Sequence, residues 1–291
     1  MQNIVIRATE QMDFRTKEAY KTLRTNLSFA GNDVRVISLT SCTPNEGKSS
    51  VSFQLCMSLA ESGKKTILVD ADLRKSVLRG RYKANKEKYG LSHYLSGQAE
   101  YEDACCQTNI ENFDIIFAGP VPPNPSELLG SDRFKSLIEL LRWKYDYVIV
   151  DTPPLGSVID GVVAATVCDG TLIVVESGAI SYKFVQNIKD QLDKGGCRVL
   201  GCVLNKVNMK TSGYYGKYYG KYYGNYGSGE AGSHMDGEAP LLSERGKSAA
   251  NEKTAKKKTD EINPDETENE TGEIELIDDF EAEEEEEEEA K

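Results

Sequence analysis

The 291-residue sequence contains no hydrophobic run long enough to span a membrane. Its longest apolar stretches, such as residues 147–150 and 172–175, have the length of buried strands, whereas a membrane-spanning helix needs about 20 apolar residues. The segment 1–15 carries charges and lacks the apolar core of a secretory signal. We therefore expect a cytoplasmic protein without a membrane segment of its own.

The seven cysteines also lack two familiar patterns. Their number is odd and no two of them are spaced as C-x-x-C, so neither a disulfide framework nor a zinc site is expected. Cys56, Cys168 and Cys202 stand in apolar surroundings, which predicts small residues buried in a core.

Charge and tyrosine are distributed unevenly along the chain. Residues 230–291 carry a net charge of −16, so the preceding body carries +4 although the whole chain is at −12. Seven of the 15 tyrosines lie between residues 214 and 226, and none follows. The tail has one aromatic residue, Phe280, and buries too little apolar surface to fold. We predict an N-terminal extension (1–15), a folded domain (16–209), a tyrosine cluster (210–229) and a disordered acidic tail (230–291).

Helix-like and strand-like patterns alternate within residues 16–209. Apolar runs typical of buried strands cover residues 34–40, 66–69, 113–117, 147–150, 171–175 and 199–204. Helical patterns cover residues 16–30, 48–62, 126–143 and 182–194. This alternation predicts an α/β fold in which helices cover both faces of a parallel sheet.

The loop after the first of these strands carries a phosphate-binding pattern and predicts a P-loop NTPase-like domain. A strand before the loop and a helix after it direct backbone N–H groups towards an anion. Lys48 is expected to reach the β- and γ-phosphates of a nucleotide, and the Ser49 hydroxyl to bind Mg²⁺. The first glycine of the pattern is replaced by Cys42, and a turn before a capped helix is the alternative interpretation. The predicted nucleotide contacts are Thr43, Pro44, Asn45, Glu46, Gly47, Lys48, Ser49 and Ser50.

Carboxylates end two of the predicted strands. Asp70 and Asp72 follow residues 66–69 at positions i and i+2, which project to the same side if the strand continues that far. Asp151 follows residues 147–150 as a Walker B aspartate does. Acidic residues at strand ends are often only turn formers. Beside a phosphate loop, however, such carboxylates can divide into a metal ligand and a general base.

Four segments resemble the bacterial tyrosine kinases, P-loop proteins of capsule and exopolysaccharide systems. They are residues 41–49, 67–74, 148–154 and the proline-rich segment 119–129, and a tyrosine cluster follows them. The resemblance covers roughly residues 14–226 and leaves the acidic tail unexplained.

The resemblance implies an ATP- and Mg²⁺-dependent protein-tyrosine kinase that phosphorylates its own cluster between subunits. It makes Lys48 and Asp70 the catalytic residues, with Asp70 as the base for the tyrosine hydroxyl. Asn205 would approach the nucleotide base, although a polar residue ending a strand is commonly a turn former. The implied magnesium ligands are Ser49, Asp72 and Asp151. The implied phosphoacceptors are Tyr214, Tyr215, Tyr218, Tyr219, Tyr222, Tyr223 and Tyr226.

The resemblance also implies partners. Glu18, Lys21 and Arg24 match a subunit-contact pattern E-x-x-R-x-x-R, except that Lys21 lacks the planar fork of arginine. A solvated helix face with an i,i+3 ion pair is the alternative. A ring-like homo-oligomer, a separate membrane activator that recruits the chain to the inner face of the membrane, and a protein-tyrosine phosphatase are expected. No nucleic-acid partner is expected.

Two other functions remain open. A partitioning or septum-positioning P-loop ATPase would hydrolyse ATP without phosphorylating protein, but such proteins usually have a second lysine where Thr43 stands. A nucleotide-binding scaffold would use its tail to recruit partners. For the cluster itself, a flexible linker is the alternative. The only charges between residues 213 and 227 are Lys217 and Lys221, so phosphates of about −1.5 to −2 each would make this segment strongly negative and release it from a neighbouring subunit.

Overall fold

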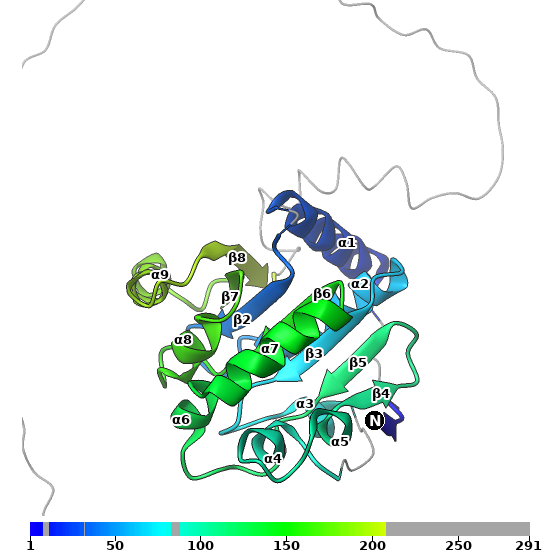
Figure 1. The fold of residues 1–291 in the computed structure, drawn as a ribbon. Coiled ribbons are helices and arrows are strands. Elements are labelled where there is room, and N and C mark those ends of the chain that lie inside the picture. The colour runs from blue at the N-terminus through cyan, green and yellow to red at the C-terminus, as the bar shows by residue number, and fades with distance from the viewer. Residues whose placement is uncertain (8–11, 32, 83–87, 208–291) are drawn as a thin grey trace, which may run out of the picture. The chain divides into compact units, whose positions relative to one another are not determined.

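The computed structural model describes residues 1–7, 12–31, 33–82 and 88–207. Eight strands form one sheet in the order β1-β4-β5-β3-β6-β2-β7-β8 (Figure 1). Neighbouring strands are parallel except for β4 and β5, which are antiparallel. The strands are β1 (Gln2–Ile4), β2 (Val36–Ser41), β3 (Thr66–Asp70), β4 (Cys106–Thr108), β5 (Phe113–Ile116), β6 (Tyr147–Asp151), β7 (Gly170–Glu176) and β8 (Val199–Asn205).

Helices connect the parallel strands and cover the sheet. Figure 1 shows α7 lying across β3 and β6, with α8 and α9 beside β7 and β8. The longer helices begin at side-chain caps where the sequence provides them: Asp13 caps α1, Ser131 caps α7 and Ser181 caps α9. The helices are α1 (Phe14–Phe29), α2 (Lys48–Glu61), α3 (Leu78–Arg81), α4 (Leu91–Leu95), α5 (Tyr101–Ala104), α6 (Pro125–Leu129), α7 (Asp132–Lys144), α8 (Asp160–Ala165) and α9 (Tyr182–Lys194).

The central strands are buried on both faces because each face packs against a different set of helices. Ile37 and Leu39 of β2 and Leu68 of β3 join the core formed with α1 and α2. Val36 and Val69, which point the other way along the same strands, join the core formed with α4, α7 and α8. The continuous β-branched and leucine runs of these strands are therefore what a two-sided parallel sheet requires.

The predicted α/β fold with helices on both faces is confirmed, and the differences are local. The helix expected over residues 126–143 is divided into α6 and α7, because the chain leaves the helix at Gly130 and Ser131 caps the next one. The expected burial of Cys202 is wrong: it is exposed, since β8 is an edge strand, while Cys56 is buried and Cys168 is half-buried. β1 lies within the segment 1–15 and pairs with β4.

Two expected segments lie outside the described residues: the tyrosine cluster and the acidic tail. No described helix is long and apolar enough to cross a membrane.

Candidate functional site

The phosphate-binding loop joins β2 to α2 at the carboxyl edge of the sheet, and its backbone requires glycine. Gly47, the residue before α2, has φ 91°, and Asn45 has φ 70°. A Cβ atom on Gly47 would lie 2.2 Å from Nδ2 of Asn205. The Val51 N–H donates to the Gly47 carbonyl at 2.9 Å, so the first turn of α2 starts directly from this loop and presents its remaining N–H groups to an anion.

Contacts from two other strands hold the loop in place. The Glu46 carboxylate is buried and accepts hydrogen bonds from the Thr43 N–H and, at 3.0 Å, from the Glu176 N–H. Asn205 Nδ2 donates to the Glu46 carbonyl at 2.8 Å, and Lys206 Nζ donates to the Asn45 carbonyl at 2.8 Å. The ends of β7 and β8 therefore fix the loop conformation before a ligand arrives.

Lys48 and Asp151 form a buried ion pair next to this loop. Lys48 Nζ lies 2.8 Å from Asp151 Oδ1, and the two side chains are 6% and 1% exposed. Ser52 Oγ donates to the same Asp151 oxygen at 2.8 Å. The second oxygen, Oδ2, is buried and has no hydrogen-bond partner among the described residues. The pair thus keeps one carboxylate oxygen open.

Asp70 ends β3 directly beside Asp151, its partner in the register of β3 and β6. Its side chain is fully buried, and Ser76 Oγ donates to its Oδ2 atom. Its Oδ1 atom has no partner within the described part of the chain. Burial, together with the nearby Asp151 charge, raises the pKa of Asp70 to about 8, although Ser76 and Lys48 act in the opposite direction. Such a carboxyl can accept or hold a proton near neutral pH.

The third predicted carboxylate, Asp72, lies outside the strand. β3 ends at Asp70, so the expected i, i+2 projection along a continuing strand is wrong. Asp72 Oδ1 instead accepts the Lys75 N–H at 3.0 Å. Asp72 therefore lies in the turn after β3, close enough for its charge to contribute to the raised pKa of Asp70.

The donor set fits a magnesium ion that is completed by phosphates and water. The described residues contain no group of three His, Cys, Asp or Glu side chains that could hold a metal ion by themselves. The Oδ1 atom of Asp70 and the Oδ2 atom of Asp151 nevertheless have no hydrogen-bond partner in that part of the chain. Ser49 Oγ lies 3.2 Å from Lys48 Nζ at the start of α2. Mg²⁺ commonly binds through one or two carboxylates and substrate phosphates.

A cavity of about 380 Å³ opens beside the loop. It brings together the predicted residues Asn45, Gly47, Ser50 and Asn205 with side chains from α1, α2 and α3. Arg81 lines it and donates to the Ser50 hydroxyl. The cavity follows the carboxyl ends of β2 and β8, where parallel α/β sheets bind ligands.

An ion pair that the sequence reasoning missed fixes the turn after β3. Arg74 Nε donates to Asp160 Oδ2 at 2.6 Å and its Nη2 to Oδ1 at 3.2 Å. Asp160 is 1% exposed and also accepts from the Ser126 hydroxyl. Burial opposes ionisation of Asp160, but the hydrogen bonds from Arg74 and Ser126 outweigh it and lower the pKa. The resemblance included Arg74, whereas nothing in the sequence marked Asp160 as its partner.

The residues expected at a subunit contact lie on α1. Lys21 Nζ and Glu18 Oε1 are 2.7 Å apart, which is the i,i+3 ion pair of the alternative interpretation. Arg24 donates to the Ser58 carbonyl on α2. Their role between subunits stays a prediction.

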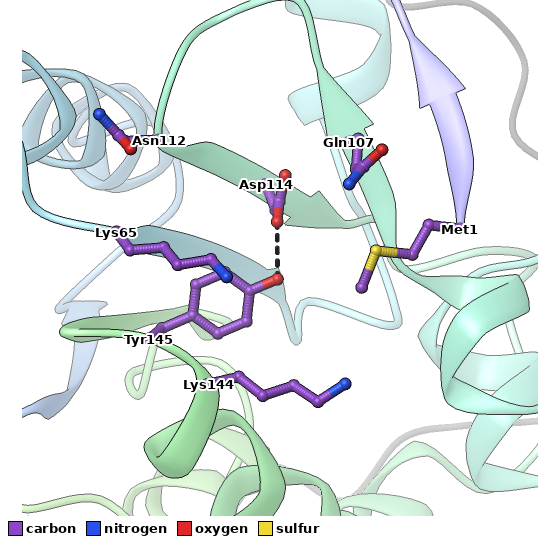
Figure 2. A pocket seen from close by; sticks show the side chains of 7 residues that line it. All are labelled: Met1, Lys65, Gln107, Asn112, Asp114, Lys144 and Tyr145. Atoms are coloured by element: carbon purple, nitrogen blue, oxygen red, sulfur yellow. Dashed lines mark hydrogen bonds between the residues drawn. The ribbon is translucent and has the colours of Figure 1, made fainter.

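Another cavity, of about 390 Å³, lies at the opposite edge of the sheet. Its residues Lys65, Asn112 and Tyr145 precede β3, β5 and β6, so it opens at the amino ends of these strands. Figure 2 shows the Tyr145 hydroxyl donating to Asp114, at 2.7 Å, with the side chains of Lys65 and Lys144 around the ring. None of the residues predicted to bind nucleotide lines this cavity.

Comparison with known proteins agrees with this geometry. The family described as AAA domain matches residues 34–195. Tyrosine-protein kinase CpsD of Streptococcus agalactiae is 42% identical over 204 residues, which cover 69% of this chain and 89% of that protein.

Two solved structures extend the comparison. The kinase domain of the Escherichia coli tyrosine kinase ETK matches with a TM-score of 0.65 and 34% identity, over 70% of this chain and 84% of that one. The septum site-determining protein MinD of Pyrococcus horikoshii, complexed with Mg-ADP, matches with a TM-score of 0.50 and 27% identity, over 59% and 70%. The loop, the strand order and the paired aspartates thus occur in a chain similar to tyrosine kinases.

Proposed function

The chain belongs to the bacterial tyrosine-protein kinases, a P-loop nucleotide-binding family, and we propose that it transfers the γ-phosphoryl group of ATP to tyrosines of its own C-terminal cluster. The identity of 42% to CpsD over most of that protein, against 27% to MinD, favours a kinase over a partitioning ATPase. The single observation that carries the proposed chemistry is Asp70, a buried carboxylate beside the Lys48–Asp151 pair.

Each group near the loop has a distinct task in this proposal. The α2 N-terminus and Lys48 bind the phosphates, so that Lys48 exchanges its contact with Asp151 for a phosphate oxygen. Asp151, Asp72 and Ser49 are the proposed ligands of Mg²⁺, which would neutralise charge on the phosphates when bound. Asn205, whose amide contacts the loop, is proposed to face the nucleotide base.

Asp70 is the proposed base for the acceptor. It takes the proton of the tyrosine hydroxyl while the phenolic oxygen forms a bond to the γ-phosphorus. The bond from that phosphorus to the bridging oxygen of ADP breaks, which leaves phosphotyrosine, ADP and a protonated carboxyl. The raised pKa of Asp70, about 8, favours its holding the proton after transfer.

The proposed acceptors are the seven tyrosines between residues 214 and 226, and the proposed route is between subunits of a homo-oligomer. Glu18, Lys21 and Arg24 on α1 are the proposed contact between them. By analogy with the family, we propose that the chain acts in the cytoplasm in capsule or exopolysaccharide synthesis. A separate membrane activator would recruit it and a protein-tyrosine phosphatase would reverse the reaction.

Replacing all seven cluster tyrosines with phenylalanine in the full chain tests the acceptor assignment. We expect incorporation of labelled phosphate from ATP to fall to background. Tyr182→Phe is the matched control, because Tyr182 is 80% exposed on α9 and lies outside the cluster. Undiminished incorporation without the cluster tyrosines would show that the acceptor lies elsewhere.

Mixing two variant chains, neither of which can phosphorylate its own cluster, tests transfer between subunits. One chain carries Lys48→Met and an intact cluster, and the other has an intact site and phenylalanines in the cluster. Phosphate on the first chain is expected only if one subunit modifies another, and its absence would indicate transfer within a chain.

A further inference from the structure

A cavity of about 620 Å³ borders the candidate base without including the nucleotide-binding loop. One wall is the segment after β3, with Ser76, Val77 and the start of α3, and the opposite wall is the segment 117–120 after β5, with α4. We call this cavity the acceptor groove. Ser76 both lines the groove and donates to Asp70 Oδ2. The groove therefore lies one side chain away from the carboxylate proposed to take the tyrosine proton.

The acceptor groove carries basic side chains. Among the described residues that line it, Arg79, Lys88 and His93 are basic and none is acidic. Nδ1 of His93 accepts the Gly90 N–H at 3.2 Å, so the neutral ring carries its proton on Nε2 and offers a donor there. Cationic and donor groups of this kind select ligands with negatively charged oxygens.

Glycine lets the segment after β5 pack closely against α4 at the edge of the groove. Gly119 lines it with φ +79°, and a Cβ atom there would lie 2.7 Å from Ser92 Oγ. Ser92 is 4% exposed, and its hydroxyl has no hydrogen-bond partner among the described residues. A buried hydroxyl without a partner is unfavourable unless a ligand or water completes it. Ser92 does not itself line the groove, but its unused hydroxyl lies against Gly119, which does.

We propose that the acceptor groove binds the chain around the target tyrosine and prefers an acceptor whose neighbouring tyrosine is already phosphorylated. This inference rests on the proposed kinase function. Between residues 213 and 227 the unmodified chain carries only the positive charges of Lys217 and Lys221, which the basic wall disfavours. One phosphate adds about −1.5 to −2, which cancels most or all of this positive charge and places anionic oxygens next to the target.

The repeat spacing fits such a preference. Tyrosine pairs recur every four residues in the cluster, which is at most about 14 Å of extended chain. Because Ser76 connects the groove to Asp70, this proposal places a phosphotyrosine one repeat away at the groove wall while the target faces Asp70. The first transfer to a cluster is then the slowest, and each phosphate favours the next transfer.

Two peptides covering residues 213–227 test the preference, one unmodified and one carrying phosphotyrosine at Tyr218. The enzyme is the full chain with phenylalanines in its own cluster, so that it does not compete. We expect kcat/KM to be about fivefold to tenfold higher for the phosphopeptide, and the ratio to fall as salt is added. Fluorescence anisotropy should likewise give a lower Kd for the phosphopeptide than for the unmodified peptide.

Charge-matched variants distinguish an effect of the basic residues in the groove from an effect of the overall charge of the protein. Arg79→Gln with Lys88→Gln is expected to bring the kcat/KM ratio close to one. Lys65→Gln with Lys144→Gln removes the same charge at the opposite edge of the sheet and should keep the ratio. Equal kcat/KM for both peptides, or a ratio that survives the groove variant, overturns the inference.

Failure of the kinase function gives a different result. If neither peptide is phosphorylated, the proposed function is refuted, and the preference for a modified acceptor is overturned with it. If both are phosphorylated equally, the kinase function stands and only the groove assignment fails.

Discussion

Gly47→Ala tests whether the loop conformation is what binds the nucleotide, and Gly63→Ala is its matched control. Both glycines have left-handed backbones, with φ +91° and +80°, and alanine in that region costs about 1–2 kcal/mol. They differ in their surroundings, because a Cβ atom on Gly63 has nothing within 4 Å, whereas one on Gly47 meets Asn205 Nδ2 at 2.2 Å.

The clash sets the expected difference between the two variants. To admit the methyl group, Asn205 must give up its 2.8 Å hydrogen bond to the Glu46 carbonyl, which is worth about 1 kcal/mol. Gly47→Ala should therefore lower the free energy of unfolding by about 1 kcal/mol more than Gly63→Ala. Distortion of the loop should also weaken ATP binding by about tenfold or more, since about 1.4 kcal/mol of binding energy is tenfold in Kd.

Urea unfolding and titration with a fluorescent ATP analogue measure both quantities. Gly63→Ala should lose stability without a change in Kd. The reasoning is refuted if both variants bind the nucleotide like the unaltered protein, or if they lose affinity equally.

Three further predictions concern parts of the fold away from the loop. Arg74→Gln leaves the buried Asp160 carboxylate without its cation and should lower the free energy of unfolding in urea by about 1–2 kcal/mol. Adding Asp160→Asn should restore part of this free energy, and a double variant no more stable than Arg74→Gln contradicts the pairing. Burial opposes ionisation of Asp169, but the Arg142 hydrogen bond and backbone N–H groups lower its pKa. The contribution of Asp169 to stability is therefore present above about pH 4 and is lost as pH falls through the lowered pKa. Asp169→Asn should reduce the pH dependence of the free energy of unfolding between about pH 5 and 2, and an unchanged slope contradicts this. Trp143, the single tryptophan, is 89% exposed, so its fluorescence emission maximum should shift little on unfolding. Trp143→Ala should change the free energy of unfolding by less than about 0.5 kcal/mol. A large shift of the emission maximum would contradict the exposure.

The carboxyl edge of the sheet could be predicted because local sequence determines it. Apolar runs that end in aspartate place Asp70 and Asp151 at strand ends, and parallel strands bring those ends together. The Gly47–Lys48 junction between a strand and a helix is likewise a local pattern. The residues that hold the site in place were not predictable in the same way.

Partners distant in the sequence account for what was missed. Nothing in the sequence indicated that the Glu46 carboxylate holds the loop by accepting the N–H of Glu176, 130 residues away. Arg74 and Asp160 are 86 residues apart, and no periodic pattern connects them. The prediction that Cys202 is buried was wrong for a related reason. The order of the strands decides which apolar run lies at an edge of the sheet, and β8 lies at one.

Labelled ATP with Mg²⁺, followed by analysis of the phosphoamino acids on the full chain, tests the central claim most directly. We predict labelled phosphotyrosine that disappears both in Lys48→Met and in Asp70→Asn, because one removes the phosphate contact and the other the proposed base. Release of inorganic phosphate without any phosphotyrosine would contradict the claim and assign the site to an ATPase.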